Sequence, residues 1–276
     1  MDIEEKILST QLKEISERTL RAFVDAFTPI LISRKTRKNY PHEERLDTHP
    51  FMSIGTGIFI TYKDCRWFAT AKHVIDNLRN EHFCAPIYLR MNSRITMLCE
   101  NATAVNFVEC DKEDIALVRL TEIDNPSIDF DNMKFIDIDN LAEKRAVDSL
   151  RVGIYGYLRK VQKSVGNEIY PSQYLTRVGA MDATLDSPVV ELEFNRRKFE
   201  GEVIDNNIVP QPNGLSGGPV FALGSVHEIA KCDSHIGVFC GLFQTQSDEG
   251  ANGKATYARL RTIKACMADA SDKLEL

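Results

Sequence analysis

The sequence predicts a mainly β protein with a helix at each end of the chain. Two observations support this class. The two ends carry apolar residues at helical spacing, and the region between them consists of short β-rich runs separated by turns. Many short strands with a turn every ten residues or so are typical of a sandwich or a barrel rather than of a parallel sheet. We therefore expect the order helix, β unit, β unit, helix.

The amino-terminal residues 3–32 are expected to form a helix, because apolar residues recur there at intervals of three and four with charged residues between them. Pro29 is expected to end or kink this helix. The basic run 33–38 and the segment 41–50 are typical of a solvated linker. Such a helix either docks a regulatory partner or packs on the β unit as simple structure, and the sequence leaves both open.

The central region is expected to hold the strands, and the first two flank a turn at Lys63-Asp64. The expected strands are 55–62, 66–70, 87–90, 95–99, 104–109, 115–120, 150–157, 189–194, 219–223 and 236–243. Helical spacing returns from Tyr257 to about Asp269. The expected divisions are an amino-terminal helix and linker (1–50), a first β unit (51–150), a second β unit (151–256), and a carboxy-terminal helix and tail (257–276).

Composition and charge narrow the function classes. The net charge of -6, from 34 basic and 40 acidic residues, disfavours nucleic acid or an anionic membrane as a partner. No apolar run approaches the roughly 20 residues of a membrane span, and the acidic amino terminus does not resemble a signal peptide. The seven cysteines are odd in number and lack paired C-x-x-C spacing. We therefore expect a cytoplasmic protein with free thiols.

A serine among glycines, in the stretch NGLSGGPV around Ser216, is the first candidate for chemistry. Glycines keep the approach to a nucleophile clear, but a serine hydroxyl also needs a general base held by a third group. His73 follows a predicted strand in FATAKHVID, and Asp114 opens the apolar strand run in EDIALVRL. Asp111 and Glu113 compete with Asp114, but the apolar run directly after Asp114 favours it as the residue at the start of a buried strand.

These segments carry a family resemblance. GTGIFI…WFATAKHV, DIALVRL and GLSGGPVF resemble the three signature blocks of trypsin-like (chymotrypsin-fold) serine peptidases. They occur in that family's order, His, Asp, Ser, with 41 residues from position 73 to 114 and 102 from 114 to 216. The resemblance spans roughly residues 51–265. It implies two antiparallel six-stranded β-barrels, with the catalytic cleft between them.

The resemblance also implies roles for individual residues. His73 corresponds to the general base, Asp114 to its orienting carboxylate and Ser216 to the nucleophile. The backbone N–H groups of Gly214 and Ser216 correspond to the oxyanion hole. The expected activity is that of a serine endopeptidase, which hydrolyses peptide bonds in protein substrates through an acyl-enzyme and uses no metal or organic cofactor.

Two departures from the digestive branch of the family bear on activation. Leu215 stands where that branch has an aspartate, and no Ile-Val-Gly-Gly activation segment precedes His73. The chain thus resembles the intracellular or bacterial members of the family, which need no trimming of the amino terminus.

The substrate-binding residues expected from the resemblance are Pro210, Cys240, Gly241 and Leu242. Pro210 stands six residues before Ser216, where an aspartate would select lysine or arginine, so we expect an uncharged, apolar or small side chain before the cut. Cys240-Gly241-Leu242 is expected to be an exposed edge that pairs with the substrate backbone as an added strand.

Three alternatives compete with the peptidase. The run from Gly214 to Gly218 also fits the G-x-S-x-G elbow of α/β-hydrolases, but that class places its histidine after the serine, and only 60 residues follow position 216 of 276. A zinc site is disfavoured because the spacing of its candidate ligands matches no standard finger; those candidates are His227, Cys232, His235 and Cys240. The third alternative is a catalytically silent binding or regulatory module with a trypsin-like fold.

Overall fold

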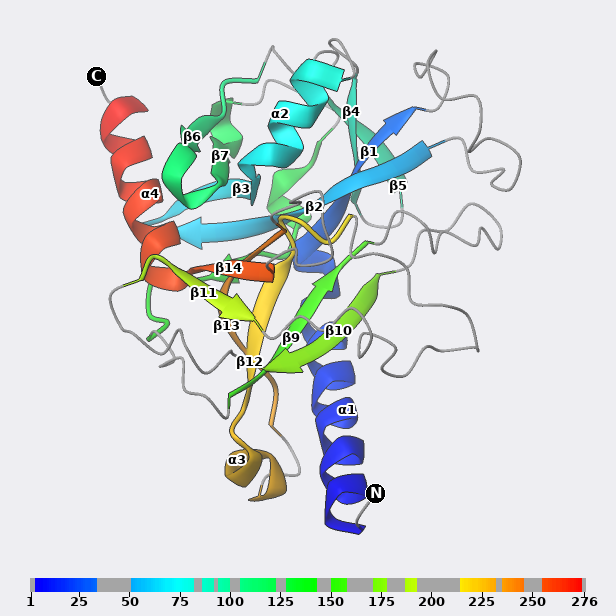
Figure 1. Cartoon of the computed structure of the whole chain (residues 1–276). Helices are drawn as coiled ribbons and strands as arrows, with labels where there is room; N and C mark the ends of the chain where they lie inside the picture. Colours follow the sequence, from blue (N-terminus) through cyan, green and yellow to red (C-terminus); the bar gives the residue numbers. More distant parts are fainter. Residues whose placement is uncertain are drawn as a thin grey trace.

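The structure of the chain is a computed structural model. It has two mainly antiparallel sheets, and a helix stands at each end of the chain (Figure 1). The expected mainly β class with terminal helices is confirmed. The residues that the structure describes are 3–33, 51–81, 86–91, 94–99, 105–122, 128–142, 150–157, 171–177, 187–192, 214–231, 235–245 and 255–274.

The first sheet has the strand order β5-β4-β1-β2-β3-β7-β6, and the short strand β8 pairs with β2 in parallel. All other pairs in this sheet are antiparallel. Its strands are β1 (Phe27–Ser33), β2 (Phe51–Tyr62), β3 (Cys65–Ala71), β4 (Ile87–Met91), β5 (Arg94–Cys99), β6 (Val108–Cys110), β7 (Ile115–Arg119) and β8 (Ile136–Asp137). The described residues therefore form eight strands in this sheet, where six were expected.

The second sheet is antiparallel throughout its described strands, in the order β10-β9-β12-β13-β14-β11. Its strands are β9 (Arg151–Gly156), β10 (Ser172–Arg177), β11 (Val189–Leu192), β12 (Pro219–Gly224), β13 (Val238–Thr245) and β14 (Ala255–Arg259). The described part of this sheet has the six strands expected.

Strand β1 corrects the expected amino-terminal helix. Helix α1 spans Ile3–Phe23, a short 3-10 turn follows at Val24–Ala26, and the chain then enters β1 between β2 and β4. The run from Phe27 to Ile32 is apolar except for Thr28 and is buried throughout, so it has no periodicity that separates a helix from a central strand. The prediction of a helix to residue 32 is wrong for this part. The first sheet therefore begins at residue 27, inside the segment expected to be helix and linker.

The turn expected at Lys63-Asp64 joins β2 to β3. Both residues have positive φ, 49° and 59°, which is the backbone of the tight turn that suits the twist of a two-stranded hairpin. This hairpin leads the chain directly into helix α2 (Lys72–Glu81), which begins where β3 ends.

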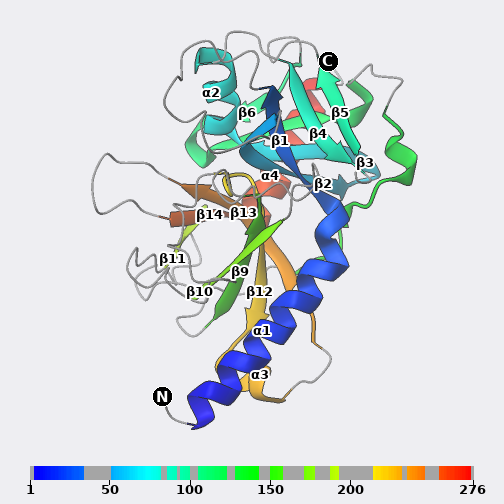
Figure 2. The ribbon, with the colours of Figure 1, turned by 90° about the vertical axis from the view of Figure 1, so that its right-hand side faces the viewer.

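Each terminal helix packs on the sheet to which it is not directly joined in the chain, as Figure 2 shows for α1 beside β12. Helix α1 leads into the first sheet but packs along β10 and β12 of the second, next to the short helix α3 (Val226–Lys231). Helix α4 (Leu260–Leu274) follows the second sheet but packs against β7 of the first as well as β13. Each helix thus ties one sheet to the other.

Helix α1 is held by buried polar contacts as well as by its apolar face. The Ser16 hydroxyl lies 2.8 Å from the hydroxyl of Tyr155, and the Thr19 hydroxyl accepts a hydrogen bond of 2.7 Å from the backbone N–H of Gly237. Burial raises the pKa of Tyr155, so the phenol stays protonated beside Ser16. These contacts favour the structural reading of this helix over a detachable docking segment.

Candidate active site

The loop that carries Ser216 is buried from Gly214 to the start of β12. Leu215 is fully buried in an apolar cluster with residues of β9, and the backbone N–H of Gly218 donates to the Leu215 carbonyl at 2.8 Å. Ser216 as a whole residue is 4% exposed. The buried side chain of Leu215 therefore holds the serine loop against the second sheet.

Thr56 on β2 fastens the same loop to the first sheet. Its backbone N–H donates to the Ser216 carbonyl at 2.8 Å, and its hydroxyl donates to the Gly214 carbonyl at 2.7 Å. The same hydroxyl accepts the backbone N–H of Tyr157 at 3.0 Å. One threonine thus bridges the serine loop, β2 and the end of β9.

Gly217 cannot carry a side chain in this arrangement. Its φ is +83°, and a Cβ there would lie 2.1 Å from the Thr56 carbonyl oxygen and 2.2 Å from the Thr70 hydroxyl. A Cβ on Gly218 would lie 2.1 Å from the Tyr155 carbonyl oxygen. The expectation that these glycines clear a path for substrate is corrected: the chain's own backbone occupies the space, so they permit the loop to pack between the sheets.

Asp114 stands in a left-handed backbone conformation with φ 49° and ψ 47°, at the end of the 3-10 turn Asp111–Glu113. Aspartate is one of the few residues other than glycine that adopts this conformation readily. The turn brings the carboxylate to the start of β7, next to the first residues of α2. The backbone N–H of Lys72 donates to the Asp114 carbonyl at 3.1 Å, which joins the two segments.

His73 lies in the first turn of α2 and meets the Asp114 carboxylate twice. Its backbone N–H donates to Oδ1 at 2.9 Å, and its Nδ1 lies 2.7 Å from Oδ2. A backbone N–H in the first turn of a helix has no partner within the helix, so the carboxylate also caps α2. Because a carboxylate accepts, we assign the ring proton to Nδ1, which leaves the lone pair on Nε2. Both side chains are about one third exposed.

Gln244 on β13 supports the Asp114 turn from the second sheet. Its side-chain amide donates to the carbonyl of Glu113 and, at 3.3 Å, to that of Asp114, and its Oε1 accepts from the Thr256 hydroxyl at 3.3 Å. Sequence reasoning missed this residue. The available signal was a glutamine directly after the apolar run of β13, where the side chain is now 3% exposed.

A charged network joins α2 to β6 and to the turn that ends at Asp114. The Lys72 ammonium lies 2.5 Å from Asp76, 3.5 Å from Glu109 and 3.4 Å from Asp111. The hydrogen bond to Asp76 is the largest cause that raises the pKa of Lys72, so the lysine stays charged. Arg79 pairs with the same Glu109. The network holds the histidine-bearing helix against the strand that precedes the aspartate.

Close packing also brings the serine loop to the histidine helix. A Cβ on Gly55 of β2 would lie 2.5 Å from a Val74 methyl and 3.3 Å from the Ser216 carbonyl oxygen, so residues 74 and 216 flank the same glycine. A Cβ on Gly217 would lie 2.9 Å from the backbone nitrogen of Ala71. The structure thus places His73 and Asp114 in direct contact, with the serine loop packed against Gly55 of β2 and against the end of β3 that leads into α2.

The residues expected to bind substrate do not lie where the sequence analysis expected them, or lie outside the described residues. Pro210 lies outside the described residues. Gly241 pairs with Val220 of β12 on one side and with Arg259 of β14 on the other, and Leu242 is likewise paired on both sides. The expectation of an exposed edge at Cys240-Gly241-Leu242 is therefore wrong: β13 is a central strand there, and the Cys240 and Leu242 side chains are buried.

Within the described parts of the chain, no group of three or more His, Cys, Asp and Glu side chains is arranged to hold a metal ion. Cys232 of the zinc alternative lies outside those parts. None of the described helices is long and apolar enough to span a membrane.

Comparisons with known proteins give structural similarities but no relative in sequence. No protein-family model matches the sequence, and a search of curated proteins finds no relative. The structure is similar to the MamO protease domain of Magnetospirillum magneticum, with 11% identity and a TM-score of 0.47 over 87% of this chain and 95% of that one. It is also similar to neuropsin, a serine protease of mouse brain, with 14% identity and a TM-score of 0.49 over 90% and 94%. At these identities and TM-scores the similarities give no residue a role.

Proposed function

We propose that the chain is a serine endopeptidase that cleaves protein substrates through an acyl-enzyme on Ser216. The observation that carries the proposal is the double hydrogen bond from residue 73 to the Asp114 carboxylate. It fixes both the ring orientation and the tautomer of a histidine whose side chain is still one third exposed. A general base requires that combination.

In this mechanism His73 Nε2 takes the proton of the Ser216 hydroxyl as Oγ attacks the carbonyl carbon of the scissile peptide. The Asp114 carboxylate stabilises the imidazolium and keeps its own charge. The imidazolium then gives the proton to the leaving amine. In the second half, His73 deprotonates a water that attacks the ester, and the serine leaves with the proton.

The backbone N–H groups of Gly214 and Ser216 are the proposed donors to the developing oxyanion. The direction of one peptide plane supports this for Ser216: the Leu215 carbonyl accepts the Gly218 N–H within the loop. In a trans peptide the carbonyl and the following N–H point in opposite directions, so the Ser216 N–H points out of the loop. Each such donor is worth about 2.7–4 kcal/mol in the transition state.

The substrate backbone is proposed to pair with the end of β13, at Gln244 and Thr245. Pairing with β12 ends near Pro219, and the last backbone bonds on that side join Phe243 to Gly217 and Gly218 at 2.8 Å. Pairing with β14 continues to Thr245. The strand therefore extends past the serine loop with only one described strand partner, which is the geometry that strand addition needs.

A fluorophosphonate probe, which modifies activated serines, tests the proposal. The wild-type protein is expected to gain one probe mass on the peptide that contains Ser216. Labelling is expected to vanish in Ser216→Ala and to fall strongly in His73→Ala. Ser271→Ala is the matched control, because that serine lies on α4 and bonds to the Met267 carbonyl. A comparison of new protein amino termini between wild type and Ser216→Ala would then give the cleavage preference.

The alternative function is a catalytically silent binding module. The observation that favours it is the burial of Ser216, a residue that is 4% exposed. A wild-type protein that shows a cooperative melting transition but no label, and that cleaves no peptide in a mixed library, would decide for the module and against the peptidase.

A further inference from the structure

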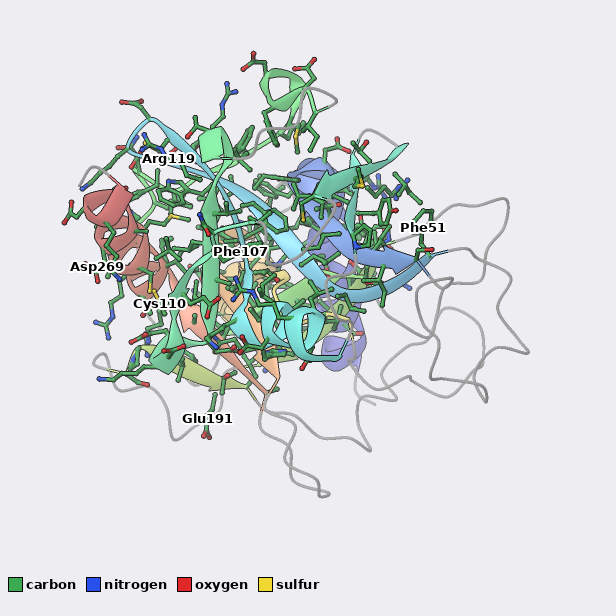
Figure 3. All side chains as sticks on the ribbon, turned by 90° about the horizontal axis from the view of Figure 1, so that it is seen from above. Phe51, Phe107, Cys110, Arg119, Glu191 and Asp269 are labelled. Atoms are coloured by element: carbon green, nitrogen blue, oxygen red, sulfur yellow. The ribbon has the colours of Figure 1, made fainter. Side chains whose placement is uncertain are left out.

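Two cysteines that are distant in the sequence meet next to the Asp111–Glu113 turn that precedes Asp114. Cys110 is the last residue of β6, and Cys266 lies in α4. Their side chains are hydrogen-bonded to each other, both are reduced thiols, and both pack on the same apolar cluster. Figure 3 shows Cys110 beside α4.

The two thiols are not equivalent. Cys110 is partly exposed, while Cys266 is only 6% exposed. The hydrogen bond from Cys266 lowers the pKa of Cys110, and that same bond, together with burial, raises the pKa of Cys266. Burial, Glu113 and Asp269 oppose this lowering of the Cys110 pKa, while Lys273 adds to it. Cys110 is therefore both the more accessible thiol and the one that ionises first, and the thiolate is the reactive form.

We propose that Cys110 and Cys266 are a thiol-oxidation site that closes to a reversible disulfide with a small disulfide, such as oxidised glutathione, as the oxidant. The Cys110 thiolate attacks one sulfur of the oxidant, and the first glutathione leaves as a thiolate. The Cys266 thiol then loses its proton and attacks the mixed disulfide at Cys110, which releases the second glutathione. Two cysteine thiols are oxidised, one small disulfide is reduced to two thiols, and the reverse reaction reopens the site.

The disulfide would join β6 and α4 covalently. Cys110 immediately precedes the 3-10 turn Asp111–Glu113, and Asp114 follows that turn. A sulfur–sulfur bond of about 2.05 Å is shorter than any contact between two thiols, so closure draws this turn toward α4. If the proposed function is right, oxidation therefore acts on the residue that orients His73.

Peptide mapping tests the site without any assay of activity. The folded protein is incubated with oxidised glutathione, and its remaining thiols are then alkylated in denaturant. Digestion with trypsin and a glutamyl endopeptidase cuts after Glu109, Lys112 and Lys264, and cleavage after Glu100 separates Cys99 from Cys110. The expected product is the peptide from 110 to 112 linked to the peptide from 265 to 273, which dithiothreitol separates.

Two variants make the result specific. Cys110→Ser is expected to lose the linked peptide. Cys65→Ser, which removes another partly exposed thiol from β3, is expected to keep the linked peptide.

The melting temperature gives a second readout. It should rise by several degrees on oxidation in wild type and Cys65→Ser but not in Cys110→Ser, because a crosslink between such distant residues restricts the unfolded chain. Alkylation of both Cys110 and Cys266 after oxidation, or links of Cys110 to several other cysteines in equal amounts, would overturn the proposal. A failure of the fluorophosphonate test would leave this result unaffected.

Discussion

The carboxylate of Asp114 accepts both a ring and a backbone hydrogen bond from one residue, and the two can be separated by a single substitution. In Asp114→Asn the amide oxygen can still accept the His73 backbone N–H, and asparagine tolerates the left-handed backbone at this position. The amide NH₂ then faces Nδ1 and favours the wrong tautomer. We expect kcat/KM on a peptide substrate to fall by roughly 10³–10⁴-fold with little change in melting temperature.

Asp111→Asn is the control for this prediction. It makes the same chemical change three residues earlier, at a side chain that is 82% exposed and paired with Lys72 at 3.4 Å. A loss of activity below about tenfold is expected there, since exposed ion pairs contribute little. Equal losses in the two variants would mean that Asp114 does not orient the histidine.

Thr56 is the second residue whose role can be isolated. Valine has the same shape, but it leaves the Gly214 carbonyl and the Tyr157 N–H without their shared buried partner. We expect Thr56→Val to lower the free energy of unfolding by about 2–4 kcal/mol, measured by chemical denaturation. Thr56→Ser keeps the hydroxyl and should cost only about 1 kcal/mol for the lost methyl group. If serine costs as much as valine, packing rather than hydrogen bonding holds the loop.

The residues predicted from the sequence and those missed differ in a physical way. His73, Asp114 and Ser216 stand in short segments whose local pattern resembles a known family, so the sequence alone singles them out. Thr56 and Gln244 act through partners more than 100 residues away, and nothing local marks them. Contact between His73 and Asp114 was an expectation that the geometry now supports, while the catalytic roles stay predictions.

At the scale of elements, the strand predictions were correct where apolar runs stand between turn residues, as at β2, β3 and β7. The prediction failed at β1, because a strand buried on both faces shows no alternation of apolar and polar residues. The residues of β1 also continue the helical spacing of α1. The prediction also failed for the edge at residues 240–242. Which strand of a sheet is central depends on pairing with distant segments, here β12 and β14, and no local pattern records that.

Helix α1 gives the prediction that belongs to this scale. Ile15 is fully buried in the same cluster as residues of both sheets, so Ile15→Ala should leave a cavity. We expect the free energy of unfolding to fall by about 2–5 kcal/mol. Glu14→Ala, on the exposed face one residue earlier, should change it by no more than about 0.5 kcal/mol. A helix that merely docks a partner would tolerate both substitutions equally, and equal denaturation curves would therefore contradict the structural role.

At the scale of the whole molecule, buried tyrosines set a limit on stability at high pH. Burial is the largest cause that raises the pKa of Tyr157 to about 12, and burial raises the pKa of Tyr155 as well. An ordinary tyrosine has a pKa of about 10. The contribution of Tyr157 is therefore fully present below pH 10 and is lost as the pH rises through about 12, because the unfolded chain gives up its proton first.

We thus expect the free energy of unfolding to decline between about pH 10 and pH 12, and to decline less steeply in Tyr157→Phe, which has no phenol to titrate. Chemical denaturation at a series of pH values measures both slopes. Identical slopes for wild type and Tyr157→Phe would show that other groups control the alkaline limit.

The apolar core decides whether the two sheets fold as one unit. One cluster contains Trp67 of the first sheet, Phe221 of the second, Ile15 of α1 and Ile263 of α4. Each terminal helix also packs on the sheet to which it is not directly joined in the chain. Separating the sheets would therefore expose this cluster and both helix faces at once, at a free-energy cost of roughly 25 cal/mol for each Å² of apolar surface.

We therefore expect calorimetry of the whole chain to show a single unfolding transition with equal calorimetric and van't Hoff enthalpies. A fragment of residues 1–150 should not melt cooperatively, since α4 and the second sheet complete its core. Two resolved transitions in the whole chain, or a fragment with its own sharp transition, would instead indicate two independent units that meet only at the proposed cleft.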